Sequence, residues 1–167
     1  FRWERRSPAR VRELHSCFER PTYTIFAGLC LSPLTENLLD AYRRSNPLLN
    51  VFDTFAMRDV GILLVTRVFP NTKAHNLDVP REGTWLLTVN DAPVESVSAF
   101  EQLMAGMRSA AETFARLRFS DDSLLVVDLA TEKRETQRVC AAGHIDHRCV
   151  ESTDRPLSEQ AEGDECK

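Results

Sequence analysis

The fold is decided by residues 21–35, which read PTYTIFAGLCLSPLT. Residues 23–31 within this stretch are mostly apolar or β-branched, and these residue types are typical of strands. The pair Ala27-Gly28 interrupts them, so the stretch predicts an extended segment with a sharp internal break. Thr35, the last residue of the stretch, is a suitable N-cap for the helix that we expect to follow.

Strand signals continue beyond this point. Residues 61–69 are rich in β-branched and apolar residues and predict a buried strand, and residues 71–77 predict a turn or a short helix. Residues 84–89 predict another strand. The pair Asn90-Asp91 closes it with a tight turn, because both residue types tolerate a positive φ.

The second half predicts a helix, two strands and a last helix. The first of these helices begins after Ser96 or Ser98, and its apolar residues recur at helical spacing. Residues 114–119 alternate between apolar and polar types, residues 124–129 return as a buried strand, and residues 131–140 can form the last helix. Antiparallel strands dominate, so we expect an α+β fold: a partly open antiparallel β-barrel capped by two or three helices.

Composition limits the class of protein. A chain of 167 residues suits one domain plus tails, and a net charge of -4 argues against a dedicated nucleic-acid-binding domain. No apolar run approaches the ~20 residues of a transmembrane helix. Five scattered cysteines are unlike a disulfide scaffold and favour a reducing compartment. The first residue is Phe, which indicates a processed chain, a fragment or the ordered part of a longer protein.

Charged segments flank the expected domain at residues 21–147. Residues 148–167 form an acidic tail that we expect to be flexible. Residues 1–20 form a basic arm, with two interpretations: a solvated arm packed on a neighbour, or a docking strip for RNA or another anionic surface. The docking candidates in this arm are Arg2, Trp3, Arg5, Arg6, Arg10 and Arg12.

The order of these elements and several local motifs resemble the second, C-terminal PDZ domain of plant-type Deg/HtrA serine proteases. The most specific likeness is the opening at residues 21–29, followed by Pro33-Leu34-Thr35. Residues 88–94 resemble the hairpin of PDZ domains, with Asp91 in place of the usual glycine. The resemblance covers about residues 21–145 and ends at His144-Ile145.

The resemblance implies a PDZ-like fold and a peptide site. Such domains add an extended peptide to a sheet edge beside a helix, and a loop with free backbone amides captures the terminal carboxylate. The alternative is a groove filled by the chain itself or by a neighbouring subunit. The implied loop residues are Ala27, Gly28, Leu29, Cys30 and Leu31. The implied groove-helix residues are Ala99, Phe100, Leu103, Met104 and Met107.

Catalytic and metal motifs are weak in this chain. The sequence has neither a serine in a Gly-Asn-Ser-Gly-Gly-like setting nor a Gly-x-Ser-x-Gly elbow, so we expect no serine-protease activity and no cofactor. One group of possible metal ligands lies close together in sequence, but its spacing is not that of a familiar zinc site, and we expect no metal there. Its members are Cys140, His144, His147 and Cys149.

The resemblance leaves three functions open. The first is a non-catalytic structural or docking subunit that binds other protein subunits or copies of itself within a larger organellar complex, the mitochondrion being favoured over the chloroplast or nucleus. The second is an oligomerisation or regulatory fragment of an active Deg/HtrA protease. The third is a free peptide-binding adaptor. A protease domain in the full-length precursor would exclude the first of these.

Overall fold

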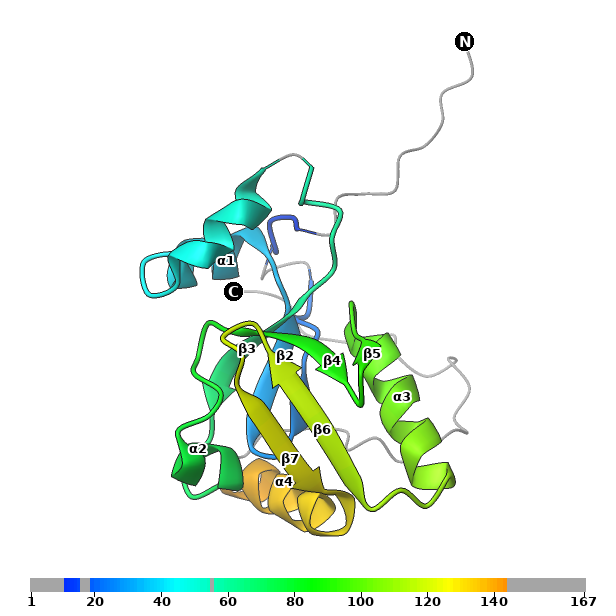
Figure 1. The fold of residues 1–167 in the computed structure, drawn as a ribbon. Coiled ribbons are helices and arrows are strands. Elements are labelled where there is room, and N and C mark those ends of the chain that lie inside the picture. Colours follow the sequence, from blue (N-terminus) through cyan, green and yellow to red (C-terminus); the bar gives the residue numbers. More distant parts are fainter. Residues whose placement is uncertain (1–10, 16–18, 55, 144–167) are drawn as a thin grey trace, which may run out of the picture.

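The computed structural model describes residues 11–15, 19–54 and 56–143. In these ranges the chain forms one antiparallel sheet, four α-helices and a short 3-10 helix, labelled η1 (Figure 1). The elements are β1 (Thr24–Phe26), β2 (Leu29–Pro33), α1 (Glu36–Tyr42), η1 (Pro47–Asp53), β3 (Leu63–Val68), α2 (Lys73–Leu77), β4 (Trp85–Val89), β5 (Ala92–Pro93), α3 (Val97–Ser109), β6 (Phe114–Phe119), β7 (Leu124–Asp128) and α4 (Leu129–Gly143).

The sheet runs in the order β1-β2-β3-β4-β6-β7, and β5 pairs with β4 alone. Each pairing between these strands is antiparallel. Strands β1 and β7 lie at the two ends of this order, so the sheet has two edges and is not closed. The partly open antiparallel α+β architecture expected from the sequence is therefore confirmed.

A two-residue turn joins β1 to β2 at the expected break. Ala27 has a φ of 50° and Gly28 a φ of 78°, and positive φ at both positions is typical of the tight hairpin turn that matches strand twist. A side chain at Gly28 would also be blocked, because its Cβ would lie 2.3 Å from the Cβ of Thr72. The prediction that Ala27-Gly28 breaks an extended stretch is confirmed.

Local signals elsewhere in the chain also form as the sequence indicates. The side chain of Thr35 accepts a hydrogen bond from the amide of Leu38 and caps α1. Ser96 caps α3 in the same way. Asn90 and Asp91 have φ values of 46° and 66°, so the turn after β4 uses the positive φ that these residue types allow.

The main core lies between the sheet and α3. Strand β6 alternates exposed and buried residues along its length, and β2 and β3 contribute fully buried leucines and one fully buried valine, Val65. Helix α3 buries Val97, Phe100, Met104 and Met107 against this surface. The apolar stripe predicted for this helix is therefore mainly core, and it fixes α3 beside β1 and β2.

A second cluster of buried side chains holds α1 and η1 in a separate lobe, at the top of Figure 1 and opposite α4. Val11 is buried in this α1–η1 lobe, and its amide donates to the carbonyl of Arg58 at 2.9 Å. The amide of Leu14 donates to the side chain of Asn37. The described end of the basic segment therefore packs on the domain.

Candidate functional site

The edge strand β1 forms the floor of a narrow cleft. Its hairpin register pairs Phe26 with Leu29 and Thr24 with Leu31. In a hairpin closed by a two-residue turn, the residues that flank the turn exchange both backbone hydrogen bonds, and the next residue points its groups the other way. The N–H and C=O of Ile25 are therefore directed away from β2 and outward from the sheet.

Helix α3 forms one wall of the cleft. The rings of Phe26 and Phe100 meet edge to face, with centroids 5.3 Å apart, and this contact fixes the distance between strand and helix. Phe100, Glu101, Met104 and Arg108 line the cleft on this side. Of the residues predicted for the groove helix, Phe100 and Met104 face the cleft. Ala99, Leu103 and Met107 do not line it.

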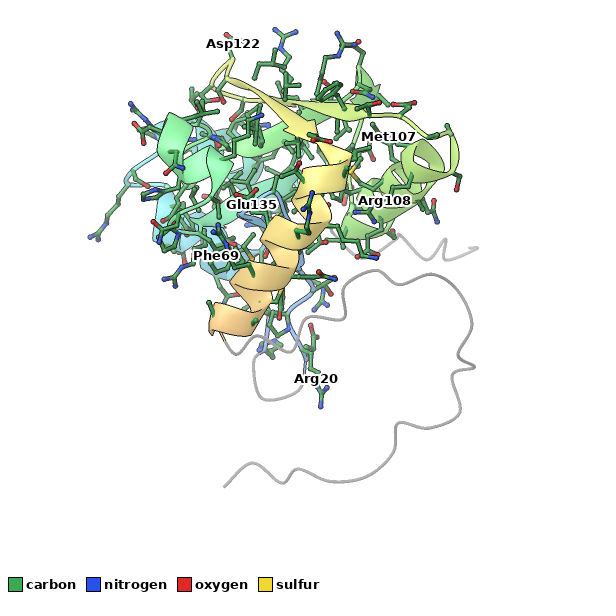
Figure 2. All side chains as sticks on the ribbon, turned by 90° about the horizontal axis from the view of Figure 1, so that it is seen from below. Arg20, Phe69, Met107, Arg108, Asp122 and Glu135 are labelled. Carbon is green, nitrogen blue, oxygen red and sulfur yellow. The ribbon has the colours of Figure 1, made fainter. Side chains whose placement is uncertain are left out.

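Helix α4 forms the opposite wall. Glu132, Lys133 and Thr136 line the cleft from this helix. Figure 2 looks onto α4, with the labelled Arg108 of α3 on one side of the helix and Phe69 on the other. The space left between the three elements is about 50 Å³, enough for a few water molecules.

A charged pair joins the two walls. Arg108 donates through Nη2 to Oε2 of Glu132 at 3.0 Å, and the hydroxyl of Thr136 donates to Oε1 at 2.6 Å. Glu132 is only 2% exposed, so both of its oxygens depend on these protein donors. A buried carboxylate needs such partners, because leaving it unpaired costs several kcal/mol.

The first turn of α4 is fixed by Asp128. One oxygen of its carboxylate accepts from the amide of Ala130, and the other accepts from the hydroxyl of Thr131. The hydrogen bond from Thr131 is the main reason that the pKa of Asp128 is lowered, and the amide of Ala130 adds to it. Asp128 therefore caps the helix as an ionised carboxylate.

The second half of α4 is fixed by apolar contacts and by two polar contacts with the chain around α2. Val139 and Cys140 are buried against Ile25, and Tyr23 and Phe69 pack against this cluster. On the other side, the carboxylate of Glu135 accepts from the amide of Lys73, and Arg138 donates to the carbonyl of Asn71. Helix α4 is thus attached along its whole length.

This arrangement of a strand edge beside a helix agrees with a sequence comparison. A family model described as a PDZ domain matches residues 11–152. The chain belongs to the PDZ domain family. No curated protein matches it at a significant level. Proteins of this family typically act as interaction modules rather than as catalysts, and they bind protein partners.

The residues expected to form a carboxylate-binding loop lie in two places in this PDZ domain. Ala27 and Gly28 form the turn after β1, whereas Leu29, Cys30 and Leu31 lie in β2. Leu29, Cys30 and Leu31 lie within the sheet and not in a loop, because β2 is paired with β1 on one side and with β3 on the other. The edge strand next to these residues is β1.

Most of the other candidates lie outside the described ranges. Of the basic arm only Arg12 is described, and its guanidinium pairs with Glu19 at 2.7 Å, whereas Arg2, Trp3, Arg5, Arg6 and Arg10 are not. Of the possible metal ligands only Cys140 is described, whereas His144, His147 and Cys149 are not. In the described ranges, no three His, Cys, Asp or Glu side chains are grouped to hold a metal ion. None of the helices described here has the length and apolar character that a bilayer crossing requires.

Sequence reasoning missed the polar residues of this site. The contact between Arg108 and Glu132 joins two helices through residues that are 24 positions apart, and neither residue lies in a recognisable motif. One feature of the sequence did point to them: the residues that α4 buries recur at helical spacing, and two of them are polar. They are Leu129, Glu132, Thr136, Val139 and Cys140.

Proposed function

We propose that this domain is a non-catalytic docking module that binds a partner protein by taking an extended segment of it beside β1. The observation that carries the proposal is the register of the β1–β2 hairpin, which directs the backbone of Ile25 outward beside α3. A segment that paired with Ile25 would extend the sheet by one strand, and its side chains would meet the wall at Phe100 and Met104.

The proposal extends to the setting of the domain. The likeness of residues 21–35 to the second PDZ domain of Deg/HtrA proteases supports an assembly role, in which the partners are other subunits or a second copy of the chain. From the same likeness we propose that the protein resides in an organelle, and we favour the mitochondrion over the chloroplast or nucleus. The alternative is that the domain drives oligomerisation of an active Deg/HtrA protease.

Peptide binding is tested at Ile25. The full chain is titrated with a panel of extended peptides, and binding is followed by fluorescence anisotropy. Ile25→Pro removes the outward N–H and should abolish binding, because proline cannot donate to an added strand. Ile25→Ala shortens the side chain in a similar way but keeps the amide, and it should retain binding. Equal binding by the two variants would contradict strand addition.

The assembly role is tested separately. Native mass spectrometry of the protein purified from its source gives the mass and composition of any complex. A stable complex with other subunits supports the docking role. A His/Asp/Ser protease domain in the full-length precursor would instead favour the oligomerisation role.

A further inference from the structure

Helix α4 lies where a bound segment would have to enter. It contributes Glu132, Lys133 and Thr136 to the lining of the cleft, and Val139 and Cys140 cover Ile25, the residue with the outward backbone groups. With about 50 Å³ of space left, a peptide has no room beside β1 while α4 is in this position. Binding therefore requires that α4 moves.

Arg108, which donates to the buried carboxylate of Glu132, is well suited to bind the carboxylate of a ligand instead. Arg108 lies on α3, and its side chain keeps 38% of its exposure, whereas Glu132 is nearly fully buried. An arginine fork recognises carboxylates of any origin, and a buried ion pair is weak evidence for a contribution to stability. If α4 moved away, Arg108 would face the open cleft without its carboxylate partner.

The apolar cluster that joins α4 to β1 contains fewer buried residues than the main core. The apolar contact between α4 and β1 is a cluster of three buried residues, Ile25, Val139 and Cys140. The main core holds twenty buried residues and includes from α4 only Leu129, at its first position. Movement of the rest of α4 would break this cluster and the polar contacts of Glu132, Glu135 and Arg138, but no buried residue of α4 beyond Leu129 belongs to the main core between the sheet and α3.

From these contacts we propose that α4 is an internal competitor for the groove and that Glu132 stands in for the carboxylate of the incoming partner. The ligand is then an extended peptide that places a carboxylate, from its C-terminus or from an Asp or Glu side chain, against Arg108. The inference rests on the proposed docking function, since it concerns the same edge and the same wall.

The test compares the full chain with Glu132→Gln, which keeps the shape of the side chain and removes its charge. The probes are seven-residue peptides that carry Glu or Gln at each position in turn, and each is made with a free and with an amidated C-terminus. We expect Glu132→Gln to bind roughly tenfold more tightly than the unchanged chain, within the usual range of coupling between two sites. Arg134→Gln, a charge change on the exposed side of the same helix, should leave the affinity unchanged.

Two further measurements sharpen the result. Hydrogen exchange should be faster in α4 of Glu132→Gln and unchanged in β2 and β3, which shows that the helix loosens while the fold remains. Arg108→Gln should bind acidic and neutral peptides equally. The free and amidated series distinguish a terminal carboxylate from a side-chain carboxylate as the preferred group.

The outcomes separate this inference from the proposed function. If peptides bind the unchanged chain and Glu132→Gln with the same affinity, or without preference for a carboxylate, the internal competitor is excluded and the docking function stands. If neither chain binds any peptide, both ideas fail. Unchanged exchange in α4 of Glu132→Gln would also overturn the inference, because Glu132 would then not hold the helix in place.

Discussion

The two edges of the sheet are protected in different ways. At one edge, β7 is five residues long, and the ammonium group of Lys73 donates to its Val126 carbonyl at 2.7 Å. A lysine at an edge is a common means of preventing contact with another strand. At the other edge, β1 has three residues, and a whole helix, α4, covers it. The comparison teaches that one edge is protected by a single side chain and the other by a whole helix.

The surfaces beside the two edges differ in the same sense. The outward face beside β7 exposes Phe114 and Leu124, each 56% exposed, together with Val126. Beside β1, the apolar side chains of Ile25 and Phe26 are buried. The chain therefore exposes an apolar surface next to the β7 edge. It buries the apolar surface next to the β1 edge, which we propose to bind peptide.

The largest expected effect on the two edges comes from Gly28→Ala, which disrupts the hairpin that forms the β1 edge. The new methyl group meets Thr72, and alanine disfavours the φ of 78°. We expect a loss of about 2–4 kcal/mol in the free energy of unfolding, measured by urea denaturation. The matched control is Gly106→Ala in α3, where nothing lies within 4 Å of the new Cβ. This control should gain about 0.5–1 kcal/mol, and equal losses in the two variants would contradict the close packing at Gly28.

The attachment of α4 is tested by Thr136→Val. Valine has nearly the same shape as threonine but donates no hydrogen bond, so Oε1 of the buried Glu132 loses its partner. We expect a loss of about 1–3 kcal/mol on urea denaturation, with faster hydrogen exchange in α4. Thr136→Ser keeps the hydroxyl and should retain more than half of that stability. A loss as large in the serine variant would assign the effect to packing instead.

The role of Lys73 in protecting the β7 edge is tested by Lys73→Met. The variant keeps most of the aliphatic length of lysine and loses the donor to Val126. We expect a change in stability below about 0.5 kcal/mol but more self-association, seen by sedimentation velocity at increasing concentration. Lys73→Arg keeps a donor and should associate no more than the unchanged chain. If Lys73→Met also remains unassociated, the lysine is not what protects β7.

The smallest expected effect is a pH dependence at the start of α4. The pKa of Asp128 is lowered in the folded chain, so its ionised form stabilises the fold at all pH values above the ordinary value of 3.8. This contribution is lost as the pH falls below 3.8 and through the lowered pKa. Amide exchange in the first turn of α4 should therefore rise in acid. Asp128→Asn cannot titrate and should lack that rise.

The sequence predicted the local elements well and the site only in part. Caps such as Thr35 and Ser96, and the turn at Asn90-Asp91, depend on neighbours within a few residues, so a single sequence reveals them. Whether Leu29–Pro33 is an edge or a central strand depends on its pairing with β3, which lies thirty or more positions further along the chain. The alternation of apolar residues is the same in both cases, so a single sequence does not distinguish them.

The cover over the groove was harder to foresee. Residues 131–140 predicted a helix, and the structure has one, but the element on which it packs is fixed by contacts across more than a hundred positions, such as those of Val139 with Ile25. A buried glutamate such as Glu132 is unusual, because this residue type is mostly exposed at protein surfaces. The sequence alone offers no means of pairing it with Arg108.

The positions at which the chain enters and leaves the fold also determine which contacts would break first under a pulling force. The segment at residues 11–14 is fastened to the α1–η1 lobe, whereas the chain leaves the described fold at Gly143, the end of α4 (Figure 1). Tension between these two points would load Val139 and Cys140 first, the contacts of Arg138 and Glu135 next, and the pair of Glu132 and Arg108 after them. Strands β2 and β3 would resist with their whole ladder at once. A pull on the chain beyond α4 would therefore open the groove before it unfolds the sheet.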